Sequence, residues 1–158
     1  KLNNSKFNVG IAWSGSFNGP NEPYRSVPLK SFQEILKLDA NFYCLQNEIW
    51  DRDLEYFQKL KLNDCGKFKL DEIASIITNL DLVITADTSI LHLSSILNKE
   101  TWAMLSLYPD WRWGKFNDFN PYSNLKFFNQ LKFNDWSNVE DSIFIELKDK
   151  INNFKRPE

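Results

Sequence analysis

Two short polar segments of this sequence contain residue types that bind phosphate. The first is Ser14-Gly15-Ser16, in which small residues let backbone N–H groups approach an anion closely while the hydroxyls donate as well. Arg25 follows, and its guanidinium group suits a charge-assisted contact to phosphate. The alternative is a solvated loop with an exposed arginine, because Gly/Ser loops are common.

The second segment runs from Asp87 through Thr88 and Ser89, directly after an apolar run and before a helical pattern. Free N–H groups and a partial positive charge at a helix N-terminus favour anions, so a diphosphate would accept hydrogen bonds there. The alternative is that Asp87 or Thr88 only caps the helix. His92 lies four residues after Thr88 and projects from the same helix face. It would hydrogen-bond a phosphate, a sugar hydroxyl or the Asp87 turn, unless it is a buried histidine bonded to backbone.

A third candidate segment combines tryptophan and arginine in the run PDWRW, residues 109–113. Such side chains stack on a flat ring or a sugar face and pair with anionic groups. An aromatic lid over the core and an interface to another domain are the alternatives, and a structural role is favoured for the tryptophans. Arg112 is the stronger ligand candidate, because arginine is seldom buried without a partner.

No catalytic constellation is evident among the remaining polar residues. The aspartates Asp51, Asp53, Asp71 and Asp87 fall on different predicted elements, and we expect them to cap helices rather than to form an acid/base pair. Neither the GxGxxG fingerprint nor the GxxxxGK[ST] motif occurs, which disfavours a dinucleotide oxidoreductase and a P-loop NTPase. The catalytic residues therefore stay unknown at this level.

Composition limits the class of protein. The chain has 158 residues, 42% of them hydrophobic, which suits one α/β domain with a core of its own. Its net charge of −2 is unlike that of a nucleic-acid binder, and no apolar run approaches the roughly 20 residues of a transmembrane segment. Cys44 and Cys65 lie outside any CxxC pair, so a reducing cytoplasm is favoured over a disulfide framework or a zinc site. The polar start without Met indicates a piece of a longer chain.

Strand and helix patterns alternate along the sequence. The predicted strands cover Phe7–Trp13, Asn41–Leu45, Leu62–Asp64, Asp81–Ala86, Thr101–Leu107 and Leu125–Phe128. The predicted helices cover Pro28–Lys37, Arg52–Leu60, Asp71–Asn79, Ser89–Leu97 and Val139–Phe154. This alternation indicates an α/β fold, a single Rossmann-like domain with a mostly parallel sheet flanked by helices. Because ligands bind outside the carboxyl ends of such strands, the candidate segments fall where a site is expected.

In order, these segments resemble the C-terminal domain of heptosyltransferase-type enzymes, glycosyltransferase family 9. They are similar above all to bacterial glycosyltransferases that carry tetratricopeptide repeats. The stretches that match are VGIAWSGS at Val9–Ser16, YRSVPL at Tyr24–Leu29, CLQ at Cys44–Gln46, the long run at Leu70–Leu97, YPDWRWG at Tyr108–Gly114 and DW at Asp135–Trp136. The likeness covers nearly the whole chain.

The resemblance implies a GT-B architecture, in which two Rossmann-like domains face a cleft. Residues 1–158 would be the domain that binds a nucleoside-diphosphate sugar, UDP- or ADP-linked. A glycan, lipid or protein acceptor would be held by a missing N-terminal domain, which also supplies the catalytic base in such enzymes. The reaction would usually invert the anomeric centre, with no metal ion and no other cofactor. From the cysteine usage we expect a cytoplasmic protein.

Site roles carry over position by position from the resemblance. Ser14–Ser16 match the diphosphate loop, and Asp87–Ser89 with His92 match the motif that contacts donor phosphate and sugar. Gln46 falls where related enzymes contact the nucleotide side, and Arg25 matches a recurring arginine that we assign to phosphate pairing.

The chain departs from the heptosyltransferase pattern at several positions. Ser89 stands where that motif has glycine, Ser94-Ser95 stand where it has alanines, and the first loop has no lysine. The donor base and sugar therefore remain open. Two other functions also remain open: a non-catalytic nucleotide-binding module, and a protein-interaction domain with Trp111–Trp113 as an exposed docking patch.

Overall fold

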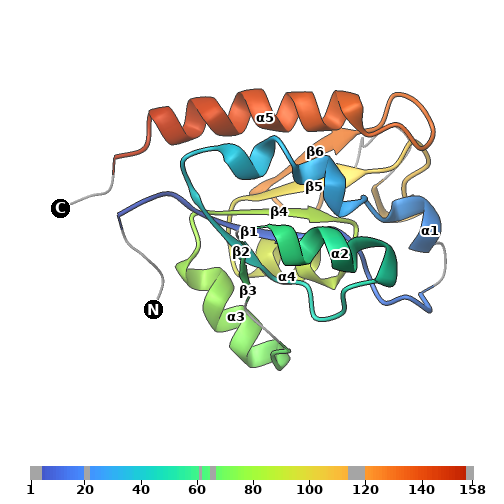
Figure 1. Ribbon diagram of the computed structural model, residues 1–158, viewed down its shortest axis with the longest axis horizontal. Helices are drawn as coiled ribbons and strands as arrows, with labels where there is room; N and C mark the ends of the chain where they lie inside the picture. The colour runs from blue at the N-terminus through green and yellow to red at the C-terminus, as the bar shows by residue number, and fades with distance from the viewer. Residues whose placement is uncertain (1–4, 20–21, 61, 65–66, 114–119, 156–158) are drawn as a thin grey trace.

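Six parallel strands form one sheet at the centre of the molecule, in the order β3-β2-β1-β4-β5-β6 (Figure 1). The computed structural model describes residues 5–19, 22–60, 62–64, 67–113 and 120–155. The strands are β1 (Asn8–Ala12), β2 (Asn41–Cys44), β3 (Asn63–Asp64), β4 (Leu82–Ala86), β5 (Thr101–Leu105) and β6 (Leu125–Asn129). The predicted Rossmann-like α/β fold is confirmed, and each strand lies where the sequence pattern placed it.

Helices cover both faces of this sheet (Figure 1). The helical segments are α1 (Glu22–Arg25), η1 (Leu29–Phe32), η2 (Ile35–Lys37), α2 (Asp51–Lys59), α3 (Leu70–Asn79), α4 (Ser89–Ile96), η3 (Trp111–Trp113) and α5 (Ser137–Asn152). One face carries α5, η1, η2 and α2, and the other carries α3 and α4. None of the described helices has the length and apolar character needed to cross a membrane.

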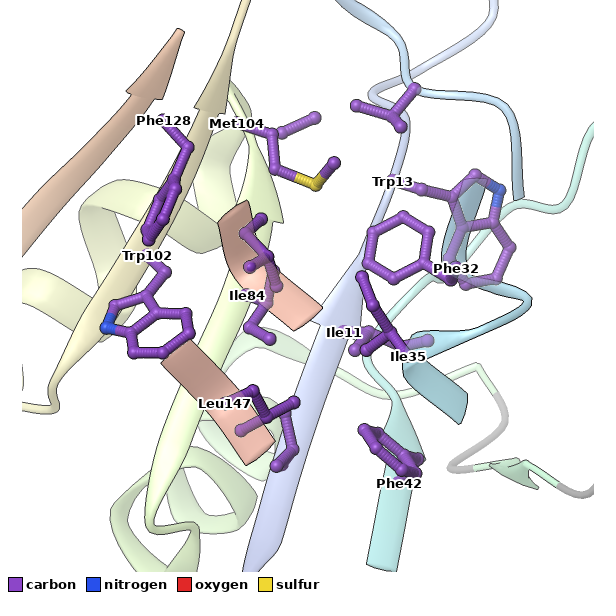
Figure 2. Packing of buried hydrophobic residues seen from close by; sticks show 14 of the residues in the cluster. Ile11, Trp13, Phe32, Ile35, Phe42, Ile84, Trp102, Met104, Phe128 and Leu147 are labelled. Carbon is purple, nitrogen blue, oxygen red and sulfur yellow. The ribbon is translucent and has the colours of Figure 1, made fainter. Parts of the chain in front are cut away.

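The core follows from the alternation of side chains along buried strands. In β1, Ile11 packs toward α5 while Ala12 packs toward α3 and α4, and Ile84 and Val83 divide in the same way in β4. Figure 2 shows Leu147 of α5 lying over the apolar side chains of the central strands. Strands buried on both faces need continuous apolar runs, which is why Leu82–Ala86 stood out in the sequence.

The predicted helix over Pro28–Lys37 is wrong, because the chain forms two short 3-10 helices there instead. Leu29, Phe32 and Ile35 recur every three residues, and all three are buried. Side chains at i and i+3 align in 3-10 geometry, so this spacing buries them at least as well as an α-helix would. Pro28 itself stays extended, at φ −60° and ψ 136°, and precedes the first turn.

The prediction that aspartates cap the helices is also wrong. Helix α3 begins after Lys69, whose N–H donates to Glu72 Oε2 over 2.8 Å, and Asp71 lies within the first turn. The residues at the N-caps of α2 and α4 are Trp50 and Thr88. An acidic first turn still suits the helix dipole, so the aspartates sit near helix starts without capping them.

Asp53 has a different role, which its buried position reveals. Its carboxylate accepts hydrogen bonds from Trp13 Nε1 and from the N–H of Leu29, each over 3.1 Å. This ties the end of β1 to η1 and fixes the loop that follows β1. Asp53 faces the core of the protein, whereas the next residue of α2, Leu54, is 42% exposed.

Candidate functional site

The candidate site lies where the strand connections diverge to opposite sides, between β1 and β4. In open α/β sheets the carboxyl ends of strands at such a switch point form a ligand pocket. A cavity of about 350 Å³ opens there, and we call it the switch-point pocket. Every site residue predicted from the sequence lines it: Ser14, Gly15, Ser16, Arg25, Gln46, Asp87, Thr88, Ser89, His92 and Arg112.

Gln46, just after β2, holds the loop that follows β1. Its Oε1 accepts from the N–H groups of Trp13 and Ser14 over 3.1 and 3.2 Å. Its Nε2 donates to the carbonyl oxygen and to Oγ of Ser14 over 2.7 and 2.9 Å. An amide has two donors and one oxygen acceptor, so these contacts occupy it fully. The geometry makes Gln46 a positioning residue for Ser14–Ser16.

The N-terminus of α4 forms the opposite wall of the pocket. Thr88 is extended at φ −133° and ψ 177°, and its Oγ1 accepts from the N–H of Ile90 over 3.3 Å. Thr88 is therefore the N-cap, which decides between the two capping candidates. The N–H of Ser89 makes no hydrogen bond within the described residues, as expected for a first-turn donor. It remains available to an anion in the pocket.

Asp87 and His92 are both held by Trp113 of η3, which the sequence did not single out as a site residue. Trp113 is fully buried, and its Nε1 donates to Asp87 Oδ2 over 3.0 Å. The imidazole of His92 stacks on the indole at 5.4 Å between ring centroids and 16° between planes. His92 Nδ1 lies 3.2 Å from the hydroxyl of Tyr122. A buried tryptophan thus fixes two lining side chains at once.

Two arginines bring positive charge to the pocket. Arg25 ends α1, and Arg112 lies in η3 with Nη1 3.5 Å from Asp110 Oδ1. The same Asp110 oxygen accepts from the N–H of Arg112 over 3.0 Å, which orders the turn. No group of three or more His, Cys, Asp or Glu side chains in the described ranges is arranged to hold a metal ion. Beside the carboxylates of Glu48 and Asp87, the pocket therefore combines backbone donors and two guanidinium groups, groups that suit a phosphate.

The model of one protein family, glycosyltransferase family 9 (heptosyltransferase), matches residues 38–141. The chain belongs to this family. Comparison with curated proteins finds no match.

Several solved structures of glycosyltransferases share the fold of this family 9 domain. ADP-heptose lipopolysaccharide heptosyltransferase II from E. coli is 13% identical with a TM-score of 0.66, over 96% of this chain and 48% of that one. E. coli heptosyltransferase WaaC with ADP is 12% identical with a TM-score of 0.63, over 93% and 43%. A family 9 transferase from Veillonella parvula is 14% identical with a TM-score of 0.58, over 98% and 41%. The chain thus spans less than half the length of each.

Burial lowers the pKa of His92 in the family 9 domain below its ordinary value of 6.5, with a smaller contribution from Arg112. Asp87 and Asp110 oppose this shift. At neutral pH the imidazole is therefore neutral. With Nδ1 beside the Tyr122 hydroxyl, Nε2 is the nitrogen left to meet a ligand.

The tryptophans divide into two roles within the family 9 domain. Trp113 is fully buried, whereas Trp111 is 84% exposed. The docking patch considered for Trp111–Trp113 is therefore wrong as a continuous surface, because the buried indole belongs to the core. The hydroxyl partner of His92, Tyr122, had no signal in the sequence, since it lies thirty positions away. Cys65 and residues 114–119 lie outside the described residues.

Proposed function

We propose that this family 9 domain binds a nucleoside-diphosphate sugar in the switch-point pocket, as the donor domain of a glycosyltransferase. The observation that carries the proposal is the convergence of Ser14–Ser16, the α4 N-terminus and two arginines on one cavity. Backbone N–H groups at a helix N-terminus and bidentate guanidinium groups are the recurrent ligands of phosphate. A cavity of about 350 Å³ falls within the usual range for small-molecule sites.

The chemistry that this pocket serves is the departure of a diphosphate. The bond from the anomeric carbon to the diphosphate oxygen breaks, and a bond from that carbon to the acceptor oxygen forms. The acceptor proton passes to a general base, and negative charge grows on the leaving group. The N–H of Ser89, Arg25 and neutral His92 would stabilise this charge. One such preorganised donor typically contributes about 2.7–4 kcal/mol, or 100–1,000-fold in rate.

The wider setting of the domain is also proposed. We place residues 1–158 as one domain, the C-terminal half of a GT-B protein whose N-terminal half binds the acceptor and supplies the base. The reaction would invert the anomeric centre without a metal. As in the bacterial transferases with tetratricopeptide repeats that the sequence resembles, we expect such repeats and a cytoplasmic location. The names of the solved relatives mention ADP and ADP-heptose, and the donor here is UDP- or ADP-linked.

Calorimetric titration of ADP, UDP and GDP, with their common sugar conjugates, tests the proposal. We expect selective binding of one diphosphate, and a ligand at 100 times its Kd should stabilise the fold by about 2.7 kcal/mol. Arg25→Ala should weaken binding by about 10- to 150-fold, which corresponds to one charged hydrogen bond of about 1.5–3 kcal/mol. Lys30→Ala, an exposed cation outside the pocket, is the control. Absence of binding by every nucleotide at millimolar concentration would contradict the proposal.

A further inference from the structure

The imidazole of His92, which lines the switch-point pocket, is held by two aromatic side chains. Its ring stacks on the indole of Trp113, and its Nδ1 lies 3.2 Å from the hydroxyl oxygen of Tyr122. The Tyr122 ring also meets the imidazole at 6.0 Å between centroids and 64° between planes. Nε2 of His92 makes no hydrogen bond within the described residues, so a ligand in the pocket meets the ring through this nitrogen.

The tautomer of a neutral imidazole decides what this nitrogen offers to a ligand. A neutral ring has one N–H donor and one lone-pair acceptor. If Nδ1 carries the hydrogen, Nε2 presents a lone pair, which repels the oxygen of an anionic diphosphate. If Nε2 carries the hydrogen, the ring donates to that oxygen. Neutral His92 can therefore stabilise a diphosphate in one tautomer only, and the partner of Nδ1 selects between them.

The Tyr122 hydroxyl favours the tautomer with hydrogen on Nε2 for a chemical reason. A phenol is a stronger acid than the N–H of neutral imidazole, and an imidazole lone pair is a stronger base than a phenol oxygen. A hydrogen bond from Tyr122 to Nδ1 is therefore stronger than one in the opposite direction. In the part of the chain that the structure describes, this hydroxyl has no hydrogen-bond partner other than Nδ1. No such group competes with Nδ1 for its hydrogen.

Local contacts hold Tyr122 in the turn that precedes β6. Its backbone N–H donates to Asn120 Oδ1 over 3.1 Å, and its carbonyl oxygen accepts from the N–H of Leu125 over 3.3 Å. Its ring packs against the buried cluster that contains Trp113 and Leu125. The hydroxyl therefore reaches His92 from an ordered turn, which favours one lasting orientation of the pair.

We propose that Tyr122 is a positioning residue that donates to His92 Nδ1, keeps hydrogen on Nε2 and so directs a hydrogen bond from His92 to the bound diphosphate. The proposal rests on the proposed function, because the acceptor is the diphosphate of the donor. Tyr122 does not itself line the switch-point pocket, so it acts on a ligand there through the imidazole. The donor on Nε2 is then in place before negative charge grows on the leaving group.

Nitrogen NMR of the imidazole tests the tautomer without any ligand, and the single histidine of the sequence makes its signals unambiguous. At alkaline pH, where the ring is neutral, a nitrogen that carries hydrogen resonates well upfield of one with a lone pair. We expect Nδ1 to be the lone-pair nitrogen in the parent chain. Tyr122→Phe removes only the hydroxyl, so the two shifts should move toward each other as the tautomers mix. Tyr56→Phe is the control, because Tyr56 is a half-buried residue of α2 outside the pocket.

Calorimetric titration with ADP, UDP and GDP tests the consequence for binding. Apparent affinity falls in proportion to the population of the competent tautomer, so we expect a loss of about 2- to 5-fold in Tyr122→Phe. In a His92→Ala background the same change should leave affinity unaltered, because Tyr122 acts through the imidazole. A residue with a merely structural role would weaken binding in both backgrounds. Tyr56→Phe should bind as the parent chain does.

The outcomes separate this proposal from the proposed function. A lone pair on Nε2 in the parent spectrum overturns the proposal whether or not nucleotides bind, and this measurement needs no variant. Identical nitrogen shifts in the parent chain and Tyr122→Phe also overturn it, because the hydroxyl would then not select the tautomer. Equal affinity losses with and without the imidazole assign Tyr122 a structural role instead. If the expected shifts appear but no nucleotide binds, the proposed function is overturned together with the diphosphate contact, while the selection of the tautomer by Tyr122 is supported.

Discussion

The indole Nε1 of Trp113 donates a hydrogen bond of 3.0 Å to Oδ2 of Asp87, and both side chains are buried. This bond joins η3 to the end of β4, at the edge of the switch-point pocket. A buried carboxylate is costly unless it is hydrogen-bonded, so Trp113 stabilises Asp87 in place as well as filling the core. The neighbouring Trp111, in contrast, makes no such hydrogen bond within the described ranges and is 84% exposed.

Replacing Trp113 by Phe should therefore destabilise the fold. The ring contact with His92 is largely kept, but Asp87 loses its donor, and an unsatisfied buried group costs about 1–3 kcal/mol. Urea denaturation monitored by circular dichroism measures the change in free energy of unfolding. Trp111→Phe is the matched control and should stay within about 0.5 kcal/mol of the parent chain. Equal stabilities of the two variants would show that the indole–carboxylate bond contributes nothing.

The amide of Gln46 gives a second prediction, because it makes four contacts to the chain after β1. Gln46→Leu keeps the volume but leaves the N–H groups of Trp13 and Ser14 unpaired. We expect a loss of about 1–3 kcal/mol in the free energy of unfolding and weaker nucleotide binding, since the Ser14–Ser16 loop loses its support. Chemical denaturation and calorimetry measure the two effects.

Gln33→Leu is the control for this substitution, because Gln33 is exposed and lies outside the switch-point pocket. If the Gln46→Leu variant folds and binds nucleotide with unchanged affinity, Gln46 does not contribute to nucleotide binding.

The sequence predicted the sheet and the site segments well for a physical reason. Strands such as Leu82–Ala86 are buried on both faces, and their continuous apolar runs fit few structures other than a buried strand. The strand order then brings the ends of β1, β2 and β4 together, so residues distant in sequence meet in one pocket. Rules about strand ends could anticipate this meeting, although whether these residues bind a donor stays a prediction.

What the sequence could not predict depends on tertiary contacts. A spacing of three between Leu29, Phe32 and Ile35 suits two kinds of helix, and packing decides between them. Asp53 was assigned as a helix cap from its residue type and position. The hydrogen bonds that its carboxylate accepts from Trp13 and Leu29 depend on the tertiary structure. The Trp113 contacts with Asp87 and His92 are invisible for the same reason.

Ser89→Pro tests the helix N-terminus as an anion site with little cost to folding. Ser89 is the first residue of α4, where proline is tolerated, and Thr88 already has the extended backbone that precedes proline. The substitution removes the N–H of a residue that lines the switch-point pocket. We expect a melting temperature close to that of the parent chain and a diphosphate affinity about 10-fold weaker, for one charge-assisted bond. Ser89→Ala keeps the N–H, so calorimetry should show near-normal affinity; equal losses in both variants would assign the effect to the hydroxyl.

His92 gives a prediction in pH, which is readily measured because it is the single histidine of the sequence. Burial lowers its pKa below 6.5 in the folded chain, whereas the unfolded chain titrates near 6.5. Between these two pKa values the unfolded state binds more protons, so the free energy of unfolding should fall as pH is lowered through that window. A bound diphosphate favours the imidazolium and should raise the pKa, so affinity for a nucleotide sugar should increase as pH falls through it. NMR titration of the imidazole, with and without ligand, measures both shifts, and His92→Gln should abolish the pH dependence of binding. A pKa that is unchanged by saturating ligand would place the diphosphate away from His92.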